Sequence, residues 1–216
     1  MIKAVIFDMG GVLVDLDLEA CKQAFKEDLG FHDIDSIIDA CHQKGIWGDM
    51  EGGVISADEF RDKVLAASRE GAGYEDVDKA LSRILVGIAS DKVSLLKRLF
   101  AEYDVYMLSN NNPIAAFYAE KMFADAGIDM YDDFRKCYLS YEMKMLKPSD
   151  AFYKAVIADI GISPDEMVFI DDSQVNVDAS IAAGLPAVYY QPGTDLVSLV
   201  EEVLGRDDLH EKGGEA

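Results

Sequence analysis

The sequence has little cysteine, few basic residues and no long apolar run, and each shortage excludes a class of protein. Its 216 residues include three cysteines, Cys21, Cys41 and Cys137, none of them in a Cys-x-x-Cys pair. Three scattered cysteines do not form a disulfide framework, and structural zinc is not expected without paired ligands. Reduced thiols fit a cytoplasmic protein, which is the location predicted here.

Basic residues are outnumbered two to one. The chain has 20 Lys and Arg against 41 Asp and Glu, a formal net charge of −21. Nucleic acid needs a face rich in Lys and Arg, and anionic membranes repel an acidic protein, so neither is expected as a partner. No uncharged apolar stretch approaches the ~20 residues that cross a bilayer. The opening apolar run is interrupted by Asp8, which favours a first strand over a signal peptide.

Short apolar strands alternate with amphipathic helices, the pattern of an α/β fold. β-branched and aromatic residues mark five strands, at Ala4–Phe7, Val105–Leu108, Cys137–Ser140, Met167–Ile170 and Ala187–Tyr190. Helical patterns between them fall at Val93–Phe100, Pro113–Ala126, Ala151–Ile160 and Val175–Ala183. This alternation predicts a Rossmann-like parallel sheet with helices on both faces. Functional groups in such sheets gather at the carboxyl ends of the strands.

About ninety residues separate the first two predicted strands, far more than one crossover needs. This segment shows no good strand but has helical stretches at Leu18–Leu29, Ile34–His42, Ala57–Ser68 and Tyr74–Val86. We therefore predict an α/β core at 1–15 and 91–204, a helical cap at 16–90 and a flexible tail at 205–216. Ser56 and Glu59 have capping-box spacing. The Gly-rich stretch Gly45–Gly53 is expected to be a loop facing the site, with Trp47 either contacting substrate or packing inside the cap.

Four polar clusters follow the predicted strands, and each also has an ordinary structural explanation. Asp8 precedes Gly10 and Gly11, so it is either a nucleophile or metal ligand at a tight turn, or simply a turn residue. Ser109 and Asn110 precede a helix that begins at Pro113, which makes either a phosphate cradle or a helix cap.

The two later clusters carry the remaining charges. Lys147 precedes Pro148 at an expected helix start, where the helix dipole disfavours a cation, so a neutralising role competes with plain solvation. Asp171 and Asp172 are adjacent carboxylates that repel each other, and a divalent cation relieves that repulsion. Oxygen ligands from Asp8 and Asp172 suit Mg²⁺. The three histidines, His32, His42 and His210, have no partners at ligand spacing.

The order of these clusters resembles the haloacid dehalogenase-like hydrolase superfamily over nearly the whole chain. The matching stretches are VIFDMGGVLVD, MLSNNN, the pair Lys147–Pro148 and VFIDDSQVN, with a small α-helical cap between the first two. The resemblance implies that Asp8 is a nucleophile forming an aspartyl-phosphate. It further implies that Asp8, the Gly10 carbonyl and Asp172 bind Mg²⁺, and that Asp171 is a second ligand or a support for Lys147. Ser109, Asn110 and Lys147 would then bind the phosphoryl group.

One position departs from the superfamily pattern. Its phosphatases usually carry a second Asp two residues after the nucleophile, which transfers protons, and here that residue is Gly10. Loss of general acid–base help costs roughly 10²–10⁴ in rate. A subgroup near the bacterial α-glucose-1-phosphate phosphatases also resembles this pattern. An anomeric oxygen is a better leaving group than an ordinary alkoxide, which agrees with that resemblance.

The predicted function is therefore that of a Mg²⁺-dependent phosphatase acting on a small phosphorylated metabolite, such as an aldose 1-phosphate. The chain is expected to act as a monomer or homodimer. Three alternatives stay open: a 2-haloacid dehalogenase, which needs no metal; a sugar phosphomutase, which needs the missing Asp; and a non-catalytic phosphate-binding protein.

Overall fold

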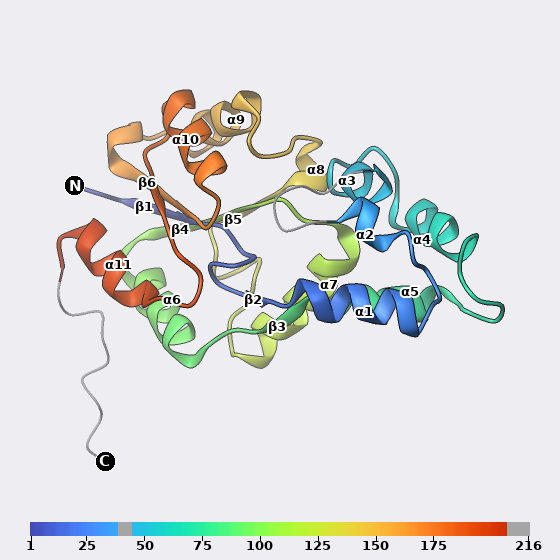
Figure 1. Cartoon of the computed structure of the whole chain (residues 1–216). Coiled ribbons are helices and arrows are strands. Elements are labelled where there is room, and N and C mark those ends of the chain that lie inside the picture. The colour runs from blue at the N-terminus through green and yellow to red at the C-terminus, as the bar shows by residue number, and fades with distance from the viewer. Residues whose placement is uncertain (39–44, 207–216) are drawn as a thin grey trace, which may run out of the picture.

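The computed structural model describes residues 1–38 and 45–206 and has a five-stranded parallel sheet at its centre (Figure 1). The strand order is β5-β4-β1-β6-β7, and every neighbouring pair is parallel. The strands are β1 (Ala4–Phe7), β4 (Asp104–Ser109), β5 (Lys136–Leu139), β6 (Met167–Asp171) and β7 (Ala187–Tyr189). The predicted parallel α/β fold is confirmed.

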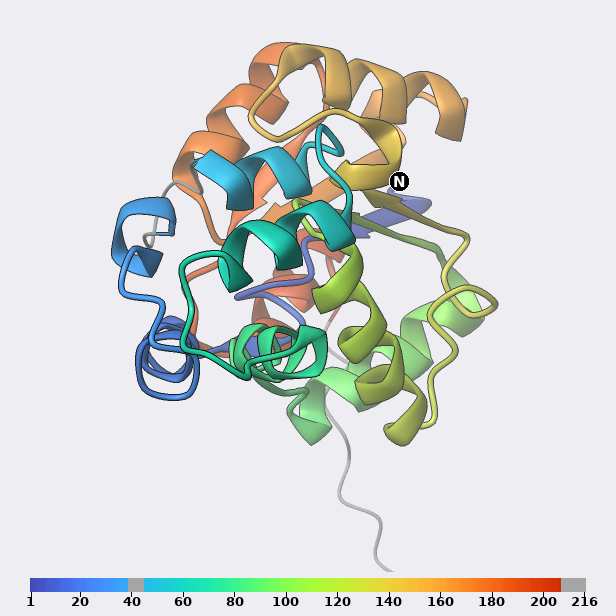
Figure 2. The same cartoon turned by 90° about the vertical axis from the view of Figure 1, so that its right-hand side faces the viewer.

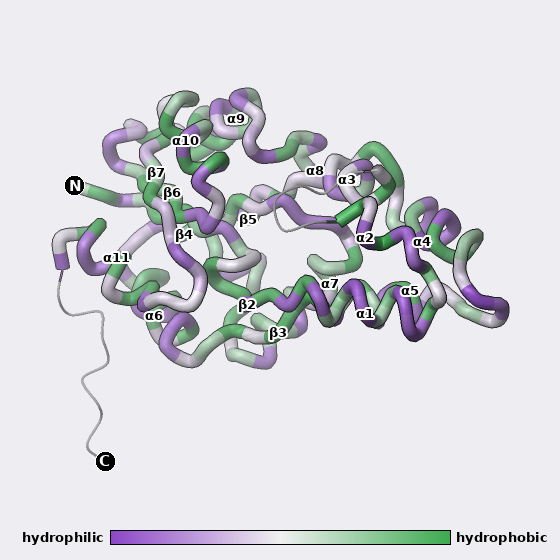
Figure 3. The backbone as a smooth tube through the Cα atoms, viewed as in Figure 1, coloured by the Kyte–Doolittle hydropathy of each residue, from purple (hydrophilic) through white to green (hydrophobic). Residues whose placement is uncertain are grey.

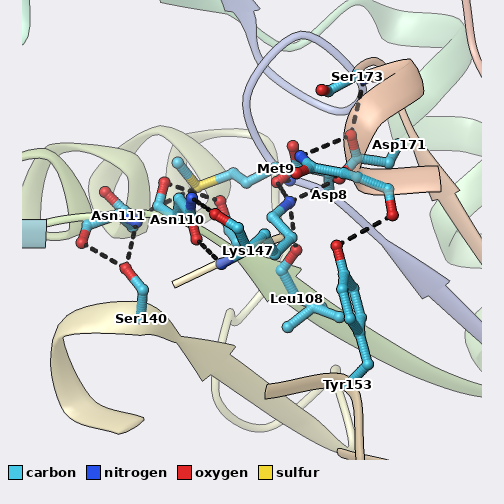
Figure 4. Close-up of polar contacts among 12 residues, drawn as sticks. Asp8, Met9, Leu108, Asn110, Asn111, Ser140, Lys147, Tyr153, Asp171 and Ser173 are labelled. Atoms are coloured by element: carbon cyan, nitrogen blue, oxygen red, sulfur yellow. Dashed lines mark hydrogen bonds and ion pairs between the residues drawn. The ribbon is translucent and has the colours of Figure 1, made fainter. Parts of the chain in front are cut away.

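The register of the three central strands brings their carboxyl ends to one level. Phe7 pairs with Met107 of β4 on one side and with Ile170 of β6 on the other. The next residues along the three strands are Asp8, Leu108 and Asp171. They therefore lie side by side at the edge of the sheet, as Figure 4 shows for this corner of the molecule.

Helices cover both faces of the sheet because alternate strand residues point to opposite sides. Val5 and Phe7 pack with α6 (Ser90–Glu102), α7 (Pro113–Asp125) and α11 (Leu196–Leu204) in one apolar cluster. Ala4 and Ile6 pack on the other face against α9 (Asp150–Ile160) and α10 (Gln174–Ala183). Figure 1 shows α9 and α10 above the sheet and α6 and α11 below it.

A separate group of helices lies between β1 and β4 in sequence and beyond the sheet edge in space (Figures 1 and 2). These helices share an apolar cluster of their own, which α7 joins through Ile114 and Ala115. They are α1 (Leu18–Glu27), α2 (Ile34–Ile37), α3 (Gly45–Glu51), α4 (Ala57–Leu65) and α5 (Tyr74–Ser82). The Ser56–Glu59 capping box at the start of α4 is confirmed. Along α1 and α5, apolar and polar stretches alternate, as expected for helices with one buried side (Figure 3).

Two short strands in the linker segments were missed by the sequence analysis. β2 (Asp15–Leu16) pairs antiparallel with β3 (Leu85–Gly87), so the chain leaves the sheet and returns to it along one ribbon. Strands of two and three residues are too short to show a periodic pattern. The domain limits at 15/16 and 90/91 stay a prediction.

The expected loop at Gly45–Gly53 is wrong, because Gly45–Glu51 forms helix α3. Trp47 is 2% exposed and packs against Phe25 and Phe60, and burial of this large ring holds a helix despite the glycines. The indole therefore packs inside the helical segment instead of lying open to a substrate. The predicted helix Ile34–His42 is too long, because α2 ends at Ile37 and the backbone of Ile38 is extended. Cys41, His42 and His210 lie outside the described residues.

Short elements complete the description, namely α8 (Ser140–Met143), which follows β5 directly, and the 3-10 helix Pro164–Glu166. Within the described ranges, none of the helices is long and apolar enough to cross a membrane.

Candidate active site

Lys147 occupies the centre of a buried polar cluster at the carboxyl edge of the sheet (Figure 4). Its Nζ donates to the Leu108 carbonyl at 3.0 Å and lies 2.7 Å from Asp171 Oδ2 and 3.0 Å from Asp8 Oδ1. These three acceptors belong to the three neighbouring strands whose register brings their ends together. The lysine thus reaches across β4, β1 and β6 at once.

The loop after α8 carries Lys147 to this position. The helix after Pro148 begins only at Asp150, so Lys147 is not at a helix start as expected from the sequence. Instead the Asn110 side chain fixes its backbone: Asn110 Nδ2 donates to the Lys147 carbonyl at 2.9 Å, and the Lys147 N–H donates to Asn110 Oδ1 at 2.8 Å. The Asn110 amide is used in positioning Lys147, while the sequence analysis expected it on the phosphoryl group.

The carboxylates around Lys147 outnumber the positive charge. One oxygen from each of Asp8, Asp171 and Asp172 lies within 4.8 Å of the others. Burial raises the pKa of Asp8 to about 7, against the lowering effect of Lys147, and Asp171 and Asp172 raise it further. Burial, reinforced by Asp171, raises the pKa of Asp172 to about 6. Burial is the main cause of both shifts, and the neighbouring carboxylates add to it.

Lys147 itself stays charged. Burial lowers its pKa, but Asp171 and Asp8 outweigh burial and raise the pKa well above its usual value. A fixed cation beside Asp8 therefore attracts any anion that approaches this carboxylate.

Asp171 has the contacts of a support for Lys147. Besides the lysine, it accepts hydrogen bonds from the Ser173 N–H at 2.7 Å and from Asn176 Nδ2 at 3.1 Å. Its side chain is fully buried, whereas Asp172 is partly exposed. Of the two roles that the sequence left open for Asp171, the contacts favour the support.

Gly11 explains how Asp172 reaches the turn after β1. A Cβ at Gly11 would lie 2.1 Å from Asp172 Oδ2, and the backbone there has a φ of +75°. Both the close approach and the left-handed backbone require glycine. Gly10 is different, since a Cβ there would meet only the tip of Leu16 at 3.0 Å.

Ser109 is buried at the end of β4, where its Oγ has a weak 3.4 Å contact with the Asn110 carbonyl. The helix α7 that follows is capped by Asn112, whose side chain accepts from the Ala115 N–H at 2.9 Å. Ser109 thus lies between the strand end and a capped helix start, close to the Leu108 carbonyl that Lys147 contacts. A phosphate contact by Ser109 stays a prediction.

Ser140, which the sequence analysis missed, and Glu51, which lies in the Gly-rich stretch expected to face the site, connect this edge to helix α3. Ser140 Oγ accepts from the Asn111 N–H at 2.9 Å and donates to the Glu51 carbonyl at 2.7 Å. The Glu51 side chain in turn accepts from Trp47 Nε1 at 2.8 Å. The Gly-rich stretch pointed to the neighbourhood of Glu51, whereas Ser140 at the end of a predicted strand carries no motif that could have found it.

Comparisons with known proteins agree with this geometry. Residues 2–184 match the haloacid dehalogenase-like hydrolase family. The D-ribitol-5-phosphate phosphatase of Bacteroides thetaiotaomicron is 33% identical over 196 residues, which are 90% of this chain and 95% of that protein. This chain therefore belongs to the haloacid dehalogenase-like (HAD-like) hydrolases, as the motifs indicated.

Solved structures show the same fold. A HAD family enzyme from Bacteroides thetaiotaomicron, in a mutant form complexed with magnesium and inorganic phosphate, has a TM-score of 0.87 and 37% identity, and the match covers 93% of this chain and 99% of that one. A predicted HAD-like family hydrolase from Porphyromonas gingivalis has a TM-score of 0.86 and 31% identity, with 96% and 100% covered.

Proposed function

We propose that this protein is a Mg²⁺-dependent phosphatase that removes the phosphoryl group from a small phosphorylated sugar or sugar alcohol. The observation that carries the proposal is the contact of Lys147 Nζ with both Asp8 and Asp171 at the buried sheet edge. A nucleophilic carboxylate beside a fixed cation is the arrangement that phosphoryl transfer to an aspartate needs.

The donor set fits magnesium. Asp8 and Asp172 offer oxygen ligands, and with Asp171 they gather three carboxylates around one lysine, a repulsion that a divalent cation would relieve. Asp8, Asp172 and the Gly10 carbonyl are the proposed ligands. When bound, the ion supplies charge neutralisation between the nucleophile and the phosphate.

The side chains of the site have separate roles in phosphoryl transfer. Asp8 attacks phosphorus and forms an aspartyl-phosphate, while Lys147 holds a phosphoryl oxygen and stabilises the charge that develops there. Asn110 and Asp171 keep Lys147 in place through its backbone and its Nζ. The proposal assigns residues 16–90 the role of a cap that encloses the substrate.

The substrate class is the finer part of the proposal. The missing Asp at Gly10 favoured an aldose 1-phosphate, whose anomeric oxygen leaves easily. The relative named for D-ribitol 5-phosphate favours a sugar alcohol phosphate, whose alkoxide leaves less easily. Both belong in the first assay.

Phosphate release with Mg²⁺ or EDTA tests the proposal on D-ribitol 5-phosphate, α-D-glucose 1-phosphate, glycerol phosphates and p-nitrophenyl phosphate. Asp8→Asn should lower turnover by at least about 10³-fold because it removes the nucleophile. Asp132→Asn is the matched control and should leave the rate unchanged, because Asp132 is an exposed carboxylate before the start of β5, whereas the site lies where the strands end.

Retained Mg²⁺-dependent turnover in Asp8→Asn would remove Asp8 as the nucleophile. If the wild-type protein releases phosphate from no member of the panel, the phosphatase proposal itself fails.

A further inference from the structure

The proposed reaction has a proton to account for. An alkoxide leaving group needs a proton as its bond to phosphorus breaks. The Asp that usually donates this proton in the superfamily is replaced here by Gly10. The Leu16 side chain occupies the space beside Gly10, with its Cδ1 at 3.0 Å from a Cβ placed there. Glycine has no side chain to transfer a proton, so another group is needed if the protein acts on ordinary alkyl phosphates.

Glu51 is a carboxyl group buried at the junction of helix α3 and the sheet edge. It is 5% exposed and is the last residue of α3. Its backbone carbonyl is held by Ser140, which directly follows β5, and Ser140 is bonded in turn to Asn111 after β4. These contacts fix the end of α3 over the ends of β5 and β4, beside the end of β1 that is followed by Asp8.

The carboxyl group itself is only partly engaged. Trp47 Nε1 donates to Glu51 Oε1 at 2.8 Å, and among the described residues no donor contacts the second oxygen. A neutral donor does not compensate a buried negative charge, and the carboxyl end of a helix disfavours one. Stability alone gives no reason for a carboxylate at this position.

Glu51 also lies within electrostatic range of the nucleophile and its lysine. Burial raises the pKa of Glu51 to about 7, against the lowering effect of the Trp47 hydrogen bond, while Asp8 raises it and Lys147 lowers it. A carboxyl group that titrates near neutral pH gives up and recovers a proton readily, which suits an acid–base catalyst.

We infer that Glu51 is the proton-transfer residue of this enzyme and takes over, from the helical segment, the work of the carboxylate missing at Gly10. The inference rests on the proposed phosphatase function. In the first step Asp8 Oδ bonds to phosphorus, the bond from phosphorus to the ester oxygen breaks, and Glu51 gives its proton to that oxygen.

The second step restores Asp8 as a carboxylate and Glu51 as a protonated acid. A water oxygen bonds to phosphorus, its proton passes to the Glu51 carboxylate, and the bond between phosphorus and Asp8 breaks. The sum is one phosphate ester and one water converted to one alcohol and inorganic phosphate. Trp47 is a positioning residue, since its indole N–H holds one Glu51 oxygen and leaves the other to exchange the proton.

Glu51→Gln tests the inference because the amide keeps the acceptor for Trp47 but cannot transfer a proton. The variant is compared with wild type on p-nitrophenyl phosphate, whose leaving group needs no proton, and on the best alkyl phosphate of the panel above. The alkyl phosphate rate should fall about 10²-fold or more. With p-nitrophenyl phosphate, a burst of one nitrophenolate per site should keep its rate within about threefold, followed by slow turnover, because only the water step then lacks its base.

The pH profile gives a second readout. Wild-type kcat/KM on the alkyl phosphate should fall as pH rises through about 7, because Glu51 then loses its proton. This fall should be absent in Glu51→Gln. Glu70→Gln is the matched control, since Glu70 is an exposed carboxylate of the same helical segment and should leave both rates and the profile unchanged.

An equal loss on both substrates, burst included, would mean that Glu51 only shapes the helical segment, and an unchanged alkyl phosphate rate would remove it from catalysis. Either result overturns the inference while the wild-type protein still releases phosphate. Failure of the phosphatase proposal is recognised separately, by the absence of any wild-type turnover.

Discussion

At the scale of single residues, the site depends on a few groups that each fix one neighbour. Lys147 is bonded to three strands, and its own backbone is fixed by Asn110. Gly11 allows the Asp172 carboxylate to approach the turn after β1. Gly10, by contrast, has room for a side chain once the exposed end of Leu16 moves aside, because only a flexible tip lies in the way. Glycine in place of the family's Asp at position 10 therefore changes the chemistry of the site, and steric hindrance by Leu16 is small.

Gly10→Asp should rescue the Glu51→Gln variant. A carboxylate at position 10 would return a proton donor to the turn beside Asp8, so the alkyl phosphate rate of the double variant should recover at least about tenfold over Glu51→Gln alone. Steady-state rates on the alkyl phosphate and on p-nitrophenyl phosphate measure the recovery. Gly10→Asn is the isosteric control without a proton to transfer. Equal effects of the Asp and Asn substitutions would contradict the account of Gly10.

At the scale of elements, the contact of α3 with α8 decides whether the helical segment reaches the sheet edge. Gly53 follows α3 with a φ of +64°, and a Cβ there would lie 2.4 Å from the Tyr141 carbonyl of α8. The Ser140 hydroxyl, at the start of α8, bonds the Glu51 carbonyl beside this close approach. The backbone at the end of α3 thus packs directly against α8, and this contact positions Glu51.

Gly53→Ala should therefore harm activity as well as stability, whereas Gly71→Ala should harm stability alone. Gly71 is a matched control because it has a φ of +83° in the same segment but no atom within 4 Å of an added Cβ. Each substitution should cost about 1 kcal/mol for the left-handed backbone. Only Gly53→Ala should also lower kcat/KM, by at least about tenfold, because it displaces the end of α3. Thermal unfolding and steady-state kinetics measure the two effects. Equal kcat/KM in both variants would contradict the role of the α3–α8 contact.

At the scale of the whole molecule, function and stability oppose each other. The chain carries a net charge of −21, and its site adds buried carboxylates whose charge the protein only partly compensates. Burial raises the pKa of Glu51 from 4.5 to about 7, so the folded state binds that proton more tightly than the unfolded state. The stability this gives is fully present below pH about 4.5 and is lost as pH rises to about 7.

Glu51→Gln should accordingly become more stable relative to wild type as pH rises. Below pH about 4.5 both proteins carry a neutral group at position 51 and should differ little, whereas above pH about 7 only the wild type buries a charge there. At about 1.4 kcal/mol per pKa unit, the relative gain is on the order of 3 kcal/mol. Urea unfolding in EDTA at both ends of this range measures it, with Glu70→Gln as the control. A pH-independent difference would show that Glu51 is not buried as a titrating group.

Local sequence patterns predicted most of the fold. The strand β1 and the start of α7 fall where the apolar runs and Pro113 indicated, and the Ser56–Glu59 box starts α4 as expected. The same patterns placed Asp8, Lys147 and Asp171 after strands, because continuous apolar runs end where a parallel sheet ends. The errors fell where local pattern and tertiary packing disagree. Gly45–Glu51 has the composition of a loop, but burial of Trp47 in the helical cluster makes it a helix.

The sequence by itself determined the fold class, the family motifs and the order of the charged groups along the chain, because each depends on residues that are close together in the sequence. Only the tertiary structure decided which of those groups touch. The Asn110 amide supports Lys147, Asp171 supports the same lysine, and Glu51 reaches the sheet edge through Ser140. These contacts join residues that are from 24 to 89 positions apart, and strand register and the packing of α3 on α8 set them. No local pattern encodes a distance of that kind.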